Sequence, residues 1–309
     1  MNGMELARAY YEAFGREMLH RDFPEIESTV AVGLCGSGSE CFGFDDDISR
    51  DHDFEPGFCL FLPGEEVIDR RTAFRLERAY AHLPAQFQGF SRARLSPVGG
   101  SRHGVIRQSD FWQKYTGTPN GALSPDAWLN IPSYALAEAT NGRLFRDDSG
   151  VFTARRIALR SMPEDARLHR LARELLTMAQ AGQYNLPRML RRGDHDAAHL
   201  CTFEFVRAAL QSLFLLNSEY MPFYKWAFRA ARALPRLSGL TESLSRLLQL
   251  PCSPQTAEEK CTLAEDVAAG IISELQAQDL TRADCGDLEK HARSVANGIE
   301  DVDIRNRGI

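Results

Sequence analysis

Two short apolar runs, separated by a glycine-rich and then acidic segment, constrain the fold of the N-terminal half most strongly. The first run, STVAVGLC at residues 28–35, is rich in β-branched and apolar residues and ends at Gly36. The second, GFCLFLPG at residues 57–64, is closed by Pro63-Gly64. Runs of this length that end at a turn residue are typical of buried strands. We therefore expect two strands here, with a turn directly after the first.

The rest of the chain divides into a mixed part and a helical part. Apolar residues recur at helical spacing over 4–20 and 65–83, HGVIRQ at 103–108 is a weaker third strand, and 141–156 reads as a hairpin turning at Asp148-Ser149-Gly150. From Met162 onward the periodicity is helical, with predicted helices over 162–182, 196–217, 223–234, 239–249, 256–277 and 286–298. The pattern predicts an α+β fold, with an N-terminal mixed β-sheet domain over 1–157 and a C-terminal α-helical bundle over 158–309.

Composition narrows the classes of protein that fit. The chain has 309 residues and a net charge of −6, which argues against a general nucleic-acid binder. No apolar run approaches the roughly 18 residues that span a bilayer, and the N-terminus has no secretory apolar core. The seven cysteines form no CxxC pair, which indicates reduced thiols and a cytoplasmic protein.

The segment GSGSECFGFDDDISRDHDF at 36–54 carries the candidate chemistry. Glycines at 36 and 38 let backbone N–H groups approach an anion closely, and Ser37 and Ser39 add hydroxyl donors, so the turn is a candidate phosphate site. Asp51 and Asp53 are two residues apart and point to the same side of an extended backbone. Paired carboxylates of this kind suit Mg²⁺, which binds carboxylates together with substrate phosphates.

Other interpretations of the acidic segment remain open. A solvated acidic surface turn would have the same composition, and Asp45-Asp46-Asp47 resemble the ligands of a calcium loop. The EF-hand spacing and its terminal glutamate are missing, however. We therefore interpret the three consecutive aspartates as loop or capping residues outside the site.

The spacing of these residues resembles a known superfamily. GSECFG at 38–43 followed by RDHDF at 50–54 is similar to the signature of nucleotidyltransferases with a polymerase-β-like core. Together with EATNGRLFRDDSGVFTARR, LLTMAQAGQYNLPRMLRRGD and NSEYMPFYKWAFRA, it resembles a bacterial family of unknown function within that superfamily. The resemblance runs from about residue 30 to 235 and implies a nucleotidyltransferase-type sheet followed by a helical bundle.

The resemblance implies roles for the matching positions. Gly38 and Ser39 would hold nucleotide phosphates, and Asp51 and Asp53 would bind Mg²⁺. Active members often carry a third carboxylate on a later strand, but HGVIRQ has none. Asp110, just past that strand, and Glu138, before the predicted hairpin, are the two candidates for a further catalytic acid or base.

Two basic side chains of the helical part are candidate phosphate ligands. They are Arg188, in the basic segment YNLPRMLRRGD, and Lys225, in the aromatic segment YMPFYKW. The sequence thus predicts Mg²⁺-dependent transfer of a nucleoside monophosphate from an NTP, most simply ATP, to an acceptor hydroxyl. The acidic charge favours a small-molecule acceptor over nucleic acid, and a homodimer stays open. The alternative is an inactive nucleotide-binding or interaction protein, for example a toxin–antitoxin partner.

Overall fold

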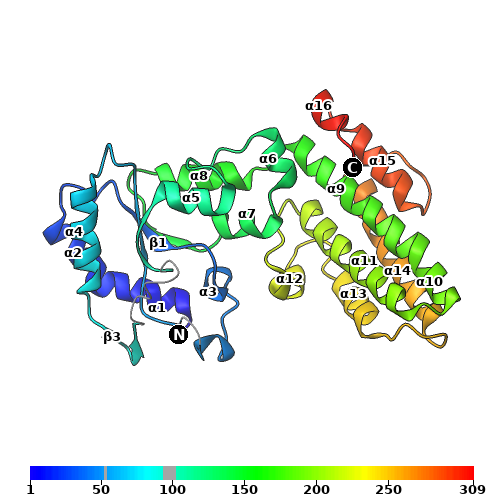
Figure 1. Ribbon diagram of the computed structural model, residues 1–309, viewed down its shortest axis with the longest axis horizontal. Helices are drawn as coiled ribbons and strands as arrows, with labels where there is room; N and C mark the ends of the chain where they lie inside the picture. Colours follow the sequence, from blue (N-terminus) through cyan, green and yellow to red (C-terminus); the bar gives the residue numbers. More distant parts are fainter. Residues whose placement is uncertain (52–53, 93–101) are drawn as a thin grey trace. The chain divides into compact units, whose positions relative to one another are not determined.

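The computed structural model describes residues 1–51, 54–92 and 102–309 (Figure 1). A mixed β-sheet with helices on both faces is followed by a long helical region, which confirms the predicted α+β class. Among the described residues, no helix has the length and apolar character needed to cross a membrane.

The chain forms two compact units. The first contains residues 1–123 and 135–161, and the second contains residues 124–134 and 162–309. The insertion of 124–134 into the second unit follows from its packing: the Arg170 guanidinium donates to the Trp128 carbonyl at 3.3 Å. The division into domains at residue 157 stays a prediction.

The first unit contains all the described strands. Its elements are α1 (Gly3–Tyr10), a π-helical turn (Tyr11–Gly15), α2 (Arg16–Asp22), β1 (Ala31–Leu34), α3 (Ser39–Phe42), a 3₁₀ turn (Ile48–Asp51), β2 (Cys59–Leu62), α4 (Arg70–Ala81), β3 (Gln86–Phe87), β4 (Phe90–Ser91), β5 (Gly104–Arg107), α5 (Gln108–Thr116), most of α7 (Ser133–Thr140), β6 (Arg143–Arg146) and α8 (Val151–Arg160).

The main sheet has the strand order β5-β2-β1-β6, and the predicted strands at 28–35, 57–64 and 103–108 are β1, β2 and β5. β1 is antiparallel to β2 and β6, with Val32 opposite Leu60, whereas β2 and β5 are parallel. Every residue of β1 and β2 is buried, as expected for strands covered on both faces.

Helices cover the two faces of the sheet, as Figure 1 shows around β1. On one face Leu60 belongs to a core cluster with Leu19 of α2 and Leu76 of α4. On the other face Phe61 contacts Phe111 of α5 and stacks on Phe152 of α8, with ring centroids 5.1 and 4.3 Å apart. This second layer places α5 beside the end of β1.

The predicted hairpin over 141–156 is wrong in its second half. Residues 143–146 form β6, but Val151 begins helix α8, which buries Phe152 and Leu159. The Asp147 carboxylate accepts a hydrogen bond from the Thr153 N–H at 2.8 Å and so supports the first turn of the helix. The helices α5, α6 (Pro125–Asn130) and α7 lie outside the predicted elements.

The second unit is helical throughout its described length, as predicted. Its elements are α6, the first residues of α7, α9 (Glu164–Met178), a π-helical segment (Ala179–Asn185), α10 (Leu186–Arg192), α11 (His195–Leu216), α12 (Tyr224–Ala231), α13 (Leu240–Gln249), α14 (Ala257–Ala277), α15 (Leu288–Asn297) and α16 (Val302–Arg305). The helix predicted to stop at Gly182 instead continues through the π-helical segment into α10, and Gly182 packs closely against Phe205 of α11.

Candidate functional site

A tight loop joins the end of β1 to the short helix α3. Gly36 and Gly38 both have positive φ, +106° and +126°. The backbone of Gly38 (ψ 141°) lies in a region that only glycine adopts readily. A Cβ at Gly38 would also collide with the Arg102 guanidinium. The loop therefore needs glycine at 38 for its backbone conformation, and a Cβ there would also displace the end of the Arg102 side chain.

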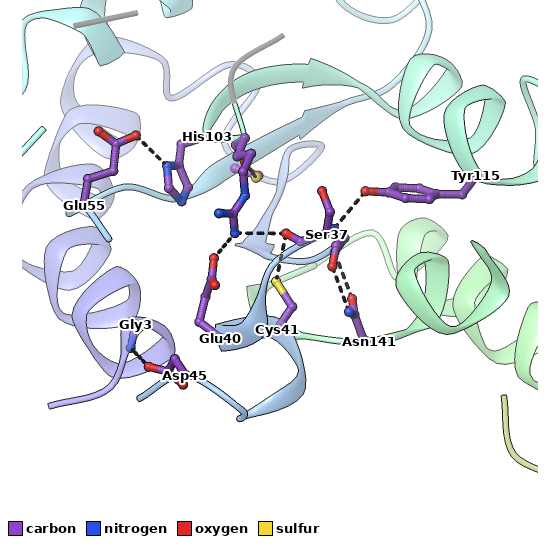
Figure 2. Close-up of polar contacts among 12 residues, drawn as sticks. Gly3, Ser37, Glu40, Cys41, Asp45, Glu55, His103, Tyr115 and Asn141 are labelled. Carbon is purple, nitrogen blue, oxygen red and sulfur yellow. Dashed lines mark hydrogen bonds and ion pairs between the residues drawn. The ribbon is translucent and has the colours of Figure 1, made fainter. Parts of the chain in front are cut away.

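Two side chains from distant parts of the chain hold this loop (Figure 2). The Asn141 amide accepts from the Gly36 N–H at 2.9 Å and donates to the Gly36 carbonyl at 2.8 Å. The Tyr115 hydroxyl accepts from the Ser37 N–H at 2.9 Å. The first two N–H groups of the predicted phosphate site are thus already bonded within the protein.

The next polar groups of the loop point to a ligand. The N–H groups of Gly38, Ser39 and Glu40 donate no hydrogen bond to any other described residue, and neither do the Ser37 and Ser39 hydroxyls. These residues are half-buried. Half-buried donors of this kind are normally satisfied by water or by a ligand. The arrangement suits an anion with several oxygen atoms.

Arg102 lies against the loop from the side of β5. Its guanidinium donates to the Ser37 carbonyl at 3.0 Å and forms an ion pair with Glu40 of α3. The pair offsets the negative charge of Glu40 beside the loop, which would otherwise repel an anion.

A pocket of about 470 Å³ opens at the loop within the first unit. Its lining includes Ser37 and three cationic side chains, Arg102, Arg107 and Lys114. Asp110, in the first turn of α5, also lines the pocket and is exposed. The pocket thus combines three cations with two carboxylates, Asp110 and Glu77, at its wall.

Glu138 of α7 belongs to the same neighbourhood. Burial raises the pKa of the Glu138 carboxyl, and the charges of Lys114 and Arg102 partly oppose that rise. No hydrogen bond or ion pair joins Glu138 to another described residue. Its electrostatic neighbours are pocket residues, so the structure brings both predicted acids, Glu138 and Asp110, close to the same cations. Their catalytic roles stay predictions.

The predicted metal ligands lie at the edge of what the structure describes. The backbone of Asp51 ends the 3₁₀ turn Ile48–Asp51, so at this residue the expected extended backbone is wrong. The side chain of Asp51 and the whole of Asp53 lie outside the described residues. Elsewhere in the described ranges, no three His, Cys, Asp or Glu side chains gather as a metal site. Mg²⁺ and its two ligands stay predictions.

The neighbouring aspartates have structural contacts. Asp45 accepts from the Gly3 N–H of α1 at 2.7 Å, and Asp46 accepts from the Ser49 N–H at 3.0 Å. Such bonds fix the segment between α3 and β2, as expected for capping residues.

The two predicted phosphate ligands of the helical part lie in the second unit and are exposed. Arg188 of α10 stacks on the Tyr184 ring, 3.8 Å from its centroid. Lys225 of α12 lies 5.3 Å from the centroid of the Trp226 ring. Each forms a cation–π contact within its own helical segment, and a role in binding phosphate stays a prediction.

The sequence did not indicate five residues of this site: Arg102, Arg107, Lys114, Tyr115 and Asn141. Tyr115 is 78 positions from its partner Ser37, and Asn141 is 105 positions from Gly36. Helical periodicity over 108–116 could have revealed α5, but nothing local indicates which loop its tyrosine reaches.

Comparison with known proteins identifies one part of the chain. Residues 128–227 match the family model described as "Domain of unknown function (DUF4037)". The match covers about a third of the chain. It confirms the predicted resemblance to a family of unknown function. It includes Glu138 and Asn141 of the loop site as well as Arg188 and Lys225.

Solved structures give one further likeness, and no curated protein matches the chain. The chain is similar to a nucleotidyltransferase-like protein from Exiguobacterium sibiricum 255-15, with 13% sequence identity and a TM-score of 0.40. The alignment covers 93% of this chain and 81% of that one.

Proposed function

We propose that this protein is a nucleotidyltransferase that binds an NTP at the loop formed by Gly36, Ser37, Gly38 and Ser39. ATP is the first candidate for that NTP. One observation carries the proposal: the loop after β1 presents three N–H groups and two hydroxyls without partners among the described residues, beside a pocket with three cations. Oxygen-rich, multiply charged triphosphate matches that set of donors.

The proposed reaction is attack of an acceptor hydroxyl on the α-phosphorus. A bond forms between the acceptor oxygen and that phosphorus, the bond to the β-phosphate oxygen breaks, and pyrophosphate leaves with the bonding electrons. Because the chain has a net charge of −6, a small-molecule acceptor is the first candidate.

Glu138 is the candidate that receives the hydroxyl proton. A carboxyl whose pKa is raised by burial is a better proton acceptor in neutral solution than an ordinary one. Asp110 is the second candidate, because it lines the same pocket.

Asp51 and Asp53 would hold Mg²⁺, which when bound would neutralise part of the triphosphate charge. This assignment rests on their Asp-x-Asp spacing after the glycine-serine loop. Arg102, Arg107 and Lys114 already supply positive charge at the pocket. The protein's own cations therefore account for part of the nucleotide affinity.

Equilibrium binding of a fluorescent ATP analogue tests the proposal. The wild-type protein is expected to bind at least tenfold more tightly in Mg²⁺ than in EDTA, and the variant Asp51→Asn plus Asp53→Asn is expected to lose that difference. Asp266→Asn, an exposed carboxylate of α14, is the matched control. Unchanged Mg²⁺ dependence in the double variant would refute the metal assignment.

Turnover is tested separately by pyrophosphate release and by transfer of label from [α-³²P]ATP to a panel of hydroxyl compounds and to the protein itself. Label transfer that requires Glu138 or Asp110 supports the proposed enzyme. Mg²⁺-dependent binding without release or transfer to any acceptor supports the inactive nucleotide-binding alternative.

A further inference from the structure

Helix α4 exposes an aromatic ring between arginines. Phe74 is 58% exposed, although phenylalanine is a residue that normally contributes to a core. Arg71 precedes it by three positions and Arg78 follows it by four, so both lie beside Phe74 on the same face of the helix. Arg75 is exposed next to them. The opposite face of α4 is buried in the core of the first unit and carries Ala73, Leu76 and Tyr80.

The two arginines beside the ring have no anionic partner close by. Within the ranges 1–51, 54–92 and 102–309, the side chains of Arg71 and Arg78 form no hydrogen bond or ion pair, and both are exposed. Arg75 has only a long pair with Glu25, at 4.0 Å. The guanidinium groups around Phe74 are thus available to an anionic partner.

The other carboxylates of this segment are used elsewhere. Asp69, whose charge interacts with that of Arg71, accepts from the Thr72 N–H at 2.7 Å and caps the helix. Glu65 pairs with Arg70 at 2.8 Å. Glu77 lines the pocket beside the loop after β1. The exposed face of α4 is therefore basic, in a chain whose net charge is −6.

The composition of this face selects the class of partner. Protein–protein interfaces are enriched in arginine and aromatic residues and depleted in lysine. Three arginines and one phenylalanine, without lysine, fit that pattern. Anionic membranes are typically recognised by clusters of about four to eight cations, and nucleic acid by about six to ten phosphate contacts. Three arginines are too few for either.

We propose that the exposed face of α4, formed by Arg71, Phe74, Arg75 and Arg78, binds an acidic amphipathic segment of a partner protein. Apolar side chains of that segment would cover the Phe74 ring, and its carboxylates would accept paired hydrogen bonds from the guanidinium groups. The face extends over seven positions of the helix, or about 10 Å, which matches two turns of a partner helix. The inference does not depend on nucleotide binding at the loop after β1.

Fluorescence anisotropy with the full chain tests the apolar part. The probe is a labelled 16-residue peptide of leucine and glutamate, arranged so that an amphipathic helix has leucine on one face and glutamate beside it. Phe74→Ala is expected to weaken binding at least about fivefold. The matched control is Phe203→Ala, which removes a ring of α11 that is 57% exposed. Circular dichroism would establish that both variants fold.

The charged part is tested by Arg71→Gln plus Arg78→Gln. This variant is expected to bind the peptide about three- to tenfold more weakly and to show a smaller dependence on salt, because it lacks two exposed ion pairs with the peptide. Arg191→Gln plus Arg192→Gln, which changes two exposed arginines of α10, is the control and should bind like the wild type. Gly38→Ala, in the loop after β1, should also bind the peptide normally.

Three results would overturn the inference. The first is an absence of peptide binding, or binding that neither Phe74→Ala nor the double arginine variant weakens. The second is equal binding of the same peptide with lysine in place of glutamate, which would show that charge is not recognised. The third is tighter binding of oligouridine, or of phosphatidylcholine vesicles containing phosphatidylserine, with loss of that binding in the double arginine variant. That result would assign the face to phosphate groups instead of a protein segment.

Discussion

Two glycine-containing turns of the first unit, at 36–40 and 147–150, each have carboxylates close by. They differ in where the hydrogen-bonding groups of the turn find their partners. In the turn between β6 and α8, Asp147 accepts from the Ser149 hydroxyl at 3.2 Å and from the Thr153 N–H at 2.8 Å. The Gly150 N–H donates to the Asp147 carbonyl at 3.1 Å. These hydrogen bonds all join residues within a stretch of seven positions.

The loop after β1 is held from far away instead. Asn141 and Tyr115 bond only its first two residues, and the N–H groups of Gly38, Ser39 and Glu40 have no partner among the described residues. The turn at 147–150 thus serves the fold, because the Asp147 carboxylate and the Gly150 N–H form local bonds that support the start of α8. The loop at 36–40 retains donors that its own structure does not use, which is what a binding loop requires.

The carboxyl groups close to the two turns, Asp148 and Glu138, have pKa values that are shifted in opposite directions. A hydrogen bond from Arg146 lowers the pKa of Asp148, beside the structural turn. Burial raises the pKa of Glu138, near the loop. One carboxylate is paired and fixed as an anion, whereas the other takes up a proton more readily.

The largest expected effect is that of Glu138→Gln on turnover. If Glu138 accepts the hydroxyl proton, its loss should slow nucleotidyl transfer by about 100-fold or more. The control is Glu77→Gln, which removes a carboxylate that lines the pocket. In the wild-type protein the rate should rise with pH through the raised pKa of Glu138, and the variant should lack that rise. Equal rates for both variants would exclude Glu138 as the base.

A pH series of unfolding tests the same carboxyl without any substrate. Because the folded-state pKa of Glu138 is raised, the folded protein binds more protons than the unfolded chain between the two pKa values. Its contribution to the free energy of unfolding is therefore present at low pH and is lost as pH rises through the folded pKa. Relative to Glu138→Gln, the wild-type protein should lose stability over that range, as measured by urea unfolding. A constant difference between the two proteins would contradict the raised pKa.

The next effect separates the two turns. Gly38→Ala should weaken ATP binding at least tenfold, because φ +126° strains alanine and the Cβ collides with Arg102. Gly150→Ala should leave ATP binding unchanged and lower the free energy of unfolding by about 1 kcal/mol, because φ is +68° and a Cβ there meets nothing within 4 Å. Circular dichroism would establish that both variants fold. Equal ATP affinity of Gly38→Ala and wild type would contradict the role of the loop.

A smaller effect is expected from the distant support of the loop. Asn141→Ala removes both hydrogen bonds to Gly36 and should weaken ATP binding about five- to tenfold, since each bond contributes about 1 kcal/mol. Asn120→Ala is the control, because Asn120 accepts only from the Ala122 N–H of its own turn at 2.9 Å. Isothermal titration calorimetry would compare the two. A similar affinity for both would show that Asn141 does not shape the binding loop.

The sequence predicted the parts of the fold that depend on local patterns. The apolar runs around β1, β2 and β5 were identified, and so were the main helices of the second unit, because burial imposes a period on such segments. The segment after β6 was misread because Val151, Phe152 and Thr153 favour strands, whereas packing of Phe152 on Phe61 selects helix α8.

The candidate site could be predicted only in part, because local sequence patterns indicate its loop but not the distant side chains that pack against it. The glycine-serine loop can be predicted from the sequence because glycine indicates a backbone conformation that other residues rarely adopt. The side chains that hold the loop come from α5 and from the residue after α7, 78 and 105 positions away. Tertiary packing alone decides those contacts, and no local pattern encodes them.

Amide hydrogen exchange with and without Mg²⁺–ATP tests the central claim most directly. The account predicts that ATP slows exchange at the N–H groups of Gly38, Ser39 and Glu40, whereas the Gly150 and Thr153 N–H groups, which are already bonded within their turn, are unaffected. ATP binding that leaves exchange at these three residues unchanged would contradict the assignment of the loop as the nucleotide site.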